Sequence, residues 1–171
     1  MMVIEKLGSS SLNRIPDLVA IDQEHYGQYG ADTTYFEAKI SDTNYQIFLV
    51  VEAGKPTGFA VIEFMTNNRQ LVDFSDNSDP LPSENWIHII AFTTKTDFAD
   101  DQSDKKLLKA LESFCISKGF HTFCVPLSVN HPYPLAYPFF ESHGYEKIGT
   151  ISWIADNGEK VPCNFLSKTT S

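Results

Sequence analysis

The sequence is poor in positive charge. It has 13 lysines and arginines against 22 aspartates and glutamates, which gives 171 residues a net charge of −9. Such a chain repels nucleic-acid phosphates and anionic lipid headgroups, so we expect neither nucleic acid nor a membrane surface as a partner. The excess of acid leaves two explanations open: a cationic substrate or partner, and solubility alone.

Cysteine is also scarce. Cys115, Cys124 and Cys163 are too few and too scattered for a disulfide framework, and none forms the CxxC pair typical of a zinc site. We therefore expect no metal centre. Cys115 and Cys124 stand in apolar runs and are expected in the core. A cysteine nucleophile is disfavoured, because Cys124 has no evident histidine and aspartate partners.

Long apolar segments are missing as well. No window approaches the ~20 apolar residues that a membrane-spanning helix needs. The N-terminal stretch MMVIEKLGSSS has no long apolar run, so we expect no signal peptide. A reduced, cytoplasmic compartment is the expected location.

The chain is rich in aromatic residues, with 13 Phe, 7 Tyr and 2 Trp, and this favours strands. It has no internal repeat and no linker, so residues 1–171 are predicted to form a single domain with a sizeable core. The hydrophobic pattern predicts the element order β-α-α-β-β-β-α-β-α-β-β.

Two parts of this pattern locate the central elements. QIFLVVEAGKPTGFAVIEFM predicts a hairpin, because Gly54 allows the positive φ that a tight turn needs. WIHIIAF and FHTFCVPLSV predict two strands, and the helix between them implies that they are parallel. The polar, acidic run over residues 66–84 is expected to be mobile or to form a rim over an acceptor site.

Three segments resemble the GNAT superfamily of acyl-CoA-dependent N-acyltransferases. EAGKPTGFAVIEF looks like the family's hairpin, WIHIIAFTT with KLLKALESF looks like its cofactor strand and helix, and AYPFFESHGYEKIG resembles its closing motif. The likeness runs from about Ile15 to Lys168. It implies a three-layer α/β domain with a mixed, mostly antiparallel, twisted sheet flanked by helices.

The resemblance implies an N-acetyltransferase that uses acetyl-CoA as co-substrate. The acceptor would be a primary amine of a small molecule or protein, which attacks the thioester directly, and a homodimer is compatible with the family. Cofactor contacts are implied at three places. The end of the first parallel strand supplies Ala91, Phe92, Thr93 and Thr94, and the turn that follows supplies Gln102, Ser103, Asp104, Lys105 and Lys106. Two later positions are Asn130 and Phe140.

The turn before the cofactor helix departs from the family. The usual Gln/Arg-x-x-Gly-x-Gly/Ala is replaced by a stretch that is about two residues longer, with Gln102 and Asp104 at the glycine positions. A carboxylate there competes with phosphate for the positive end of the helix, so we expect acetyl-CoA to bind more weakly than is usual in the family. Two explanations stay open: Asp101 and Asp104 cap the helix themselves, or nearby donors hold phosphates in a rearranged loop, namely Ser103, Lys95, Lys105 and Lys106.

The catalytic positions match those of the family only in part. Phe140 stands where many members carry the tyrosine that protonates the leaving thiolate. Tyr137 and Tyr133, three and seven residues earlier, could replace it if a helix ran through all three, although Pro138 would disturb that helix; packing is the alternative role. His88 matches the position of a base in some amine acetyltransferases, and a half-buried structural histidine is the alternative.

Other acids and the end of the first helix complete the candidates. Glu84 and Glu63 are weaker base candidates, and Glu84 could also bind the acceptor. Glu24, His25 and Tyr26 lie where the family's first helix meets the acceptor, although an exposed helix end would explain them equally well. The lost glycines and tyrosine also allow a different function, a catalytically degenerate domain that binds a ligand or partner.

Overall fold

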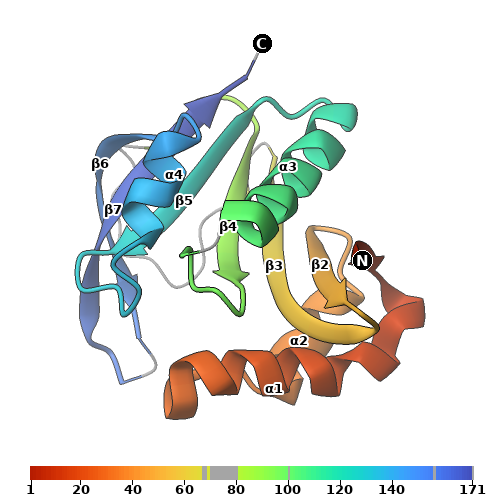
Figure 1. Cartoon of the computed structure of the whole chain (residues 1–171). Helices are drawn as coiled ribbons and strands as arrows, with labels where there is room; N and C mark the ends of the chain where they lie inside the picture. Colours follow the sequence, from red (N-terminus) through yellow and green to blue (C-terminus); the bar gives the residue numbers. More distant parts are fainter. Residues whose placement is uncertain (67–68, 70–80, 100, 156, 171) are drawn as a thin grey trace. The chain divides into compact units, whose positions relative to one another are not determined.

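The structure is a computed structural model that describes residues 1–66, 69, 81–99, 101–155 and 157–170 (Figure 1). Its elements follow the predicted order. The helices and strands are β1 (Met2–Leu7), α1 (Ile15–Tyr26), α2 (Thr33–Ile40), β2 (Tyr45–Glu52), β3 (Lys55–Met65), β4 (Trp86–Thr93), α3 (Asp101–Ser117), β5 (Thr122–Ser128), α4 (Ala136–Ser142), β6 (Glu146–Ile154) and β7 (Lys160–Thr169). Two short 3-10 helices, η1 (Ser9–Arg14) and η2 (Gly27–Tyr29), flank α1.

The strands form one seven-stranded sheet in the order β1-β2-β3-β4-β5-β7-β6. β4 and β5 pair in parallel, with Ile87 opposite Phe123, and this confirms the prediction from the strand-helix-strand pattern. The pairs β1–β2, β2–β3, β5–β7 and β6–β7 are antiparallel. The predicted fold class, a mixed and mostly antiparallel sheet with flanking helices, is therefore confirmed.

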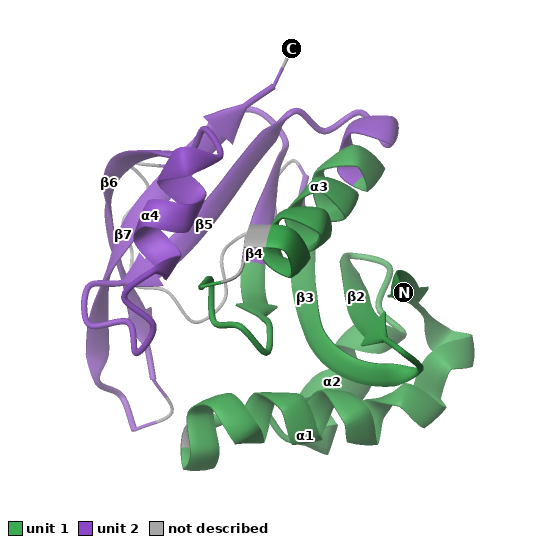
Figure 2. Cartoon of the chain, viewed as in Figure 1, with its two compact units in different colours: residues 1–63, 90–114 green, residues 64–89, 115–171 purple. Residues whose placement is uncertain are grey.

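Contacts within the chain gather into two compact units (Figure 2). Unit 1 consists of residues 1–63 and 90–114, and unit 2 of residues 64–89 and 115–171. β3, β4 and α3 each contribute residues to both units. The single domain expected from the sequence stays a prediction.

Unit 1 has helices on both faces of its strands. Alternate residues of β2 point to opposite faces, and Ile47, Leu49 and Val51 join the apolar side chains of α1 and α2 in one core cluster. Phe48, on the other face, meets Phe114 of α3 edge to face, with ring centroids 5.7 Å apart. Figure 1 shows the same arrangement, with α1 and α2 on one side of β2 and β3 and α3 on the other.

Unit 2 has its own core. Trp86, Cys124, Cys163 and Phe165 are buried together, and the rings of Trp86 and Phe165 lie edge to face at 5.8 Å. The helix α4 starts at Ala136, which places Pro138 in its first turn. Pro138 explains this start, because proline is tolerated only in the first turn of a helix.

The β2–β3 hairpin is closed by two residues with positive φ, Ala53 at 50° and Gly54 at 77°. Two consecutive positive φ values are typical of the tight hairpin turns that match strand twist. Gly54 was predicted in this role, whereas the left-handed Ala53 was not. Glu52, the last residue of β2, directly precedes this turn.

Residues 67, 68 and 70–80 of the expected acidic loop over residues 66–84 lie outside the described residues, so the behaviour of this loop stays a prediction. Within the described part of the chain, no helix combines the length and the apolarity needed to cross a membrane.

Candidate functional site

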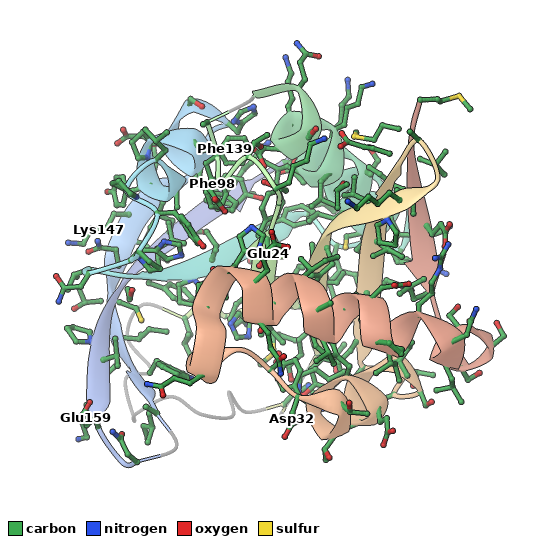
Figure 3. All side chains as sticks on the ribbon, turned by 60° about the horizontal axis from the view of Figure 1, so that its bottom comes forward. Glu24, Asp32, Phe98, Phe139, Lys147 and Glu159 are labelled. Carbon is green, nitrogen blue, oxygen red and sulfur yellow. The ribbon has the colours of Figure 1, made fainter. Side chains whose placement is uncertain are left out.

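The loop between β4 and α3 is the part of unit 1 where the sequence predicts a phosphate turn. It contains two consecutive non-glycine residues with positive φ, Asp97 at 50° and Phe98 at 70°. The Phe98 ring (labelled in Figure 3) stacks on that of Phe92 at 5.7 Å with an interplanar angle of 19°. Residues in this φ range cost free energy and persist where surrounding contacts hold them.

Asp104 holds this loop from the first turn of α3. Its side chain is fully buried, and its carboxylate accepts hydrogen bonds from the hydroxyl groups of Thr94 and of Thr96, the latter at 3.1 Å. The carboxylate of Asp104 therefore holds the loop, and the buried residue is not available to a ligand in this conformation. The proposed capping partner Asp101 begins α3, but its side chain lies outside the described residues.

Glu52 supplies a second carboxylate at the same helix end. Its Oε1 accepts a hydrogen bond from Ser103 Oγ at 2.9 Å, and its Oε2 is paired with Lys95 Nζ. The ammonium group of Lys95 and the hydroxyl of Ser103 hold the pKa of the Glu52 carboxyl below its ordinary value. The first turn of α3 therefore already holds an anion, and that anion belongs to the protein.

His25 ties the last turn of α1 to the same loop. Its Nδ1 lies 2.8 Å from the Ile21 carbonyl oxygen, and its Nε2 lies 2.7 Å from the Thr94 carbonyl oxygen and 3.0 Å from Asp97 Oδ1. The side chain is only 8% exposed. The explanation of His25 as part of an exposed helix end is therefore wrong; it is a buried tie between α1 and the loop.

Asp22 lies one turn earlier on α1 and is also buried. Its Oδ2 accepts a hydrogen bond from the Ala31 backbone N–H at 2.6 Å. Burial raises the pKa of this carboxyl, while the bond from Ala31 and the nearby His25 act in the opposite direction. The raised value means that the folded chain holds a proton here more tightly than the unfolded chain does.

We expect Asp22→Asn to leave the free energy of unfolding at pH 7 unchanged or raised by less than about 1 kcal/mol, because the amide oxygen keeps the bond to Ala31 without a buried charge. In the native protein, this group adds stability below its unfolded pKa near 3.8 and loses it as the pH rises through the higher folded value. Urea denaturation between pH 3 and 7 tests this, with the exposed Glu24→Gln on the same helix as control (Figure 3). A clear loss of stability in Asp22→Asn at pH 7 would contradict it.

The end of β4 is closely approached by β3. A Cβ placed on Gly58 would lie 2.7 Å from the Thr93 carbonyl oxygen and 3.1 Å from the Thr94 Cα. Real side chains do not tolerate such a distance to backbone atoms, so glycine is required here. The backbone of Thr93 and Thr94, where the resemblance implies cofactor contacts, is thus positioned by contact with β3.

His88, the candidate base, belongs to unit 2. It is 3% exposed, so the alternative of a half-buried histidine on a polar face is wrong as to burial. Its ring lies 5.8 Å from that of Trp86, and its partner across the parallel pair is Cys124. The role of His88 as base stays a prediction, and any substrate must reach it through a nearly closed surface.

The aromatic candidates of α4 separate from one another. Phe140 is fully buried and meets Tyr145 edge to face at 5.3 Å, so it is a core residue. Tyr133 precedes α4, which begins at Ala136, and therefore does not share a helical face with Tyr137. Tyr137 is partly exposed within α4 and keeps its place as the candidate acid.

The cysteines take no part in the site. All three are buried, as expected for Cys115 and Cys124. Burial raises the pKa of Cys124 to about 12, which leaves it protonated and a poor nucleophile at neutral pH. Among the described residues, no group of three or more histidine, cysteine or acidic side chains is arranged to hold a metal ion.

The remaining predicted residues differ in their exposure. Gln102, Lys105 and Lys106 are exposed on the first turns of α3. Ala91 packs against the unit 1 core, and Phe92, Thr93 and Thr94 are buried. In unit 2, Asn130 is exposed, and the exposed Glu84 accepts a hydrogen bond from the Thr122 hydroxyl at 2.9 Å. Glu63 is 2% exposed, and Tyr26 is partly buried at the end of α1.

Sequence reasoning missed the residues that organise the loop, namely Glu52, Thr96 and Asp97. Glu52 lies 51 residues before Ser103, and no local pattern joins the two. The signal available for Glu52 was its place beside a predicted hairpin turn, which specifies where it stands but not what it contacts.

The chain resembles solved structures of N-acetyltransferases. An N-acetyltransferase from Staphylococcus aureus Mu50 matches with a TM-score of 0.74 at 13% identity, over 99% of this chain and 97% of its own. The ribosomal-protein-S18-alanine N-acetyltransferase from Escherichia coli matches with a TM-score of 0.69 at 16% identity, over 100% and 95%. The aminoglycoside 6'-N-acetyltransferase from Enterococcus faecium matches with a TM-score of 0.69 at 14% identity, over 98% and 96%.

No protein-family model matches the sequence. No curated protein matches it either. The structural similarities show that the chain has the GNAT fold.

Proposed function

We propose that this chain of GNAT fold is an N-acyltransferase that transfers an acetyl group from acetyl-CoA directly to a primary amine. The observation that carries the proposal is the anion held at the start of α3. Lys95 and Ser103 bind the two oxygens of the Glu52 carboxylate there, and an ammonium and a hydroxyl group are also the donors that a phosphate needs. The residues present therefore fit the diphosphate of a coenzyme A donor.

The chain's own groups take the following roles in this proposal. The co-substrate supplies an acetyl group activated as a thioester. Backbone groups over residues 91–94 hold its pantetheine arm, and Lys95 and Ser103 hold phosphate, with the exposed Gln102, Lys105 and Lys106 at the rim. His25 and Asp104 fix the loop that carries these groups.

The proton transfers are assigned to unit 2. His88 takes the proton of the attacking amine, and Tyr137 gives a proton to the leaving thiolate. Within unit 2, Glu84 attracts the acceptor, a cationic amine of a small molecule or protein, which suits the net charge of −9. Within unit 1, Glu24 and Tyr26 are further candidates for this role. A covalent cysteine intermediate is excluded from the scheme, since the pKa of Cys124 is about 12.

We expect acetyl-CoA and desulfo-CoA to bind the native protein in a calorimetric titration. We also expect His88→Ala to lower kcat with a good amine acceptor by about a hundredfold at unchanged acetyl-CoA affinity, because the variant loses the group that accepts the proton of the amine. His121→Ala, which removes an exposed histidine of the same unit, serves as the control. Equal activity of the two variants would remove His88 from the mechanism.

One observation favours a second function, a GNAT-fold domain that binds a ligand or partner without catalysis. Phe140 occupies the position of the family's tyrosine and is fully buried, so the usual acid is absent there. Binding of acetyl-CoA without release of coenzyme A in the presence of a broad panel of amines would support this function over the first.

A further inference from the structure

Glu52 connects two segments of unit 1 that are distant in sequence. It ends β2, and its carboxylate reaches Ser103 in the first turn of α3 and Lys95 in the loop after β4. The hydroxyl of Thr57, across the hairpin on β3, also stabilises the carboxylate and contributes to its lowered pKa. The Glu52 side chain is 20% exposed and that of Lys95 is 55% exposed, so solvent reaches this cluster mainly at Lys95, while Oε2 of Glu52 is buried.

The donors around Glu52 are the donors that an incoming phosphate would use. The N-terminal turn of a helix favours a negative charge, and it gains little from a second one nearby. The Ser103 hydroxyl has one proton, which Oε1 of Glu52 already accepts. A phosphate that accepts the Ser103 hydroxyl proton must therefore displace Glu52 from it, and a phosphate bound to Lys95 must tolerate the nearby charge of Glu52.

We propose that Glu52 is a specificity residue for the acyl donor: it acts as an internal anion at α3 that a diphosphate must displace, so that the diphosphate adds little to donor affinity. The proposal rests on the function proposed above. A donor made only of acetylated pantetheine has no diphosphate to place at α3. The proposal therefore implies that the affinity of such a donor depends little on Glu52.

Calorimetric titration of three proteins with two donors tests the proposal. The proteins are the native chain, Glu52→Gln, and Glu37→Gln, a matched loss of one charge at an exposed position of α2. We expect Glu52→Gln to bind acetyl-CoA about tenfold more tightly than the native chain, equivalent to ~1.4 kcal/mol. S-acetylpantetheine should bind all three proteins equally, and Glu37→Gln should match the native chain with both donors.

The outcomes separate this proposal from the function on which it rests. Unchanged or weaker acetyl-CoA binding by Glu52→Gln, with normal binding by the native chain, overturns the role of Glu52 and leaves the acetyl donor in place. An equal gain for both donors overturns it too, since the gain would not involve the diphosphate. Failure of all three proteins to bind acetyl-CoA overturns both. If Glu52→Gln does not fold, Glu52→Asp replaces it, with a carboxylate one methylene too short to span the cluster and the same expected direction.

Discussion

Asp104→Ala is expected to lower the free energy of unfolding by about 3 kcal/mol, because it leaves the hydroxyl groups of Thr94 and Thr96 without the charged acceptor that now holds them. Chemical denaturation followed by circular dichroism measures the loss. Lys109→Ala, at an exposed position of the same helix, is the control and should change stability by less than about 0.5 kcal/mol. A loss below about 1 kcal/mol in Asp104→Ala would show that the loop does not depend on this carboxylate.

The same residue decides how the missing glycines of the turn should be understood. If Asp104 were only an obstacle to phosphate, Asp104→Gly would improve acetyl-CoA binding. Asp104 is fully buried and holds the loop, so we expect the glycine variant to bind acetyl-CoA less well and to unfold more easily. Of the two carboxylates at this helix end, Glu52 is the one whose removal should help a phosphate.

Gly58→Ala is expected to cost about 3 kcal/mol, since the added methyl group would lie 2.7 Å from the Thr93 carbonyl oxygen and force the backbone at the end of β4 to move. The displacement should also weaken acetyl-CoA binding, because the residues moved are those assigned to the pantetheine arm. Thermal unfolding and calorimetric titration measure the two effects.

Gly8→Ala is the matched control for Gly58→Ala. A Cβ at Gly8 meets no atom within 4 Å, and the backbone there is extended, so this variant should unfold like the native protein. Equal stability of the two alanine variants would show that β3 has room to move away from β4.

The order and type of the elements followed from the sequence because local patterns determine them. Asp32 is of a residue type that caps helices, and its side chain accepts the Tyr35 backbone N–H in the first turn of α2 at 2.9 Å. Gly119 follows α3 with a φ of 93°, which glycine adopts readily. Each of these signals involves only residues within a few positions of one another.

The arrangement of the site followed much less well, because its contacts join distant positions. His25 and Thr94 are 69 residues apart, and neither shows a pattern that names the other. The burial of His88 was underestimated for a related reason. Its neighbours in WIHIIAF are apolar on both faces of the strand, which is typical of a strand covered on both sides. The expected half-burial of His88 followed from the polarity of histidine alone and ignored these neighbours.

The sequence separation between the hydrogen-bonded residues around the β4–α3 loop also sets an order in which these contacts can form as the chain is synthesised. Asp104 follows Thr94 and Thr96 by ten and eight residues, so this tie closes a short loop as soon as the first turn of α3 exists. The ties from His25 and Glu52 span 69 and 51 residues and pay a larger entropy of closure. A newly made chain can therefore shape this loop from its own neighbours first, and α1 and the hairpin then dock onto a loop that is already folded.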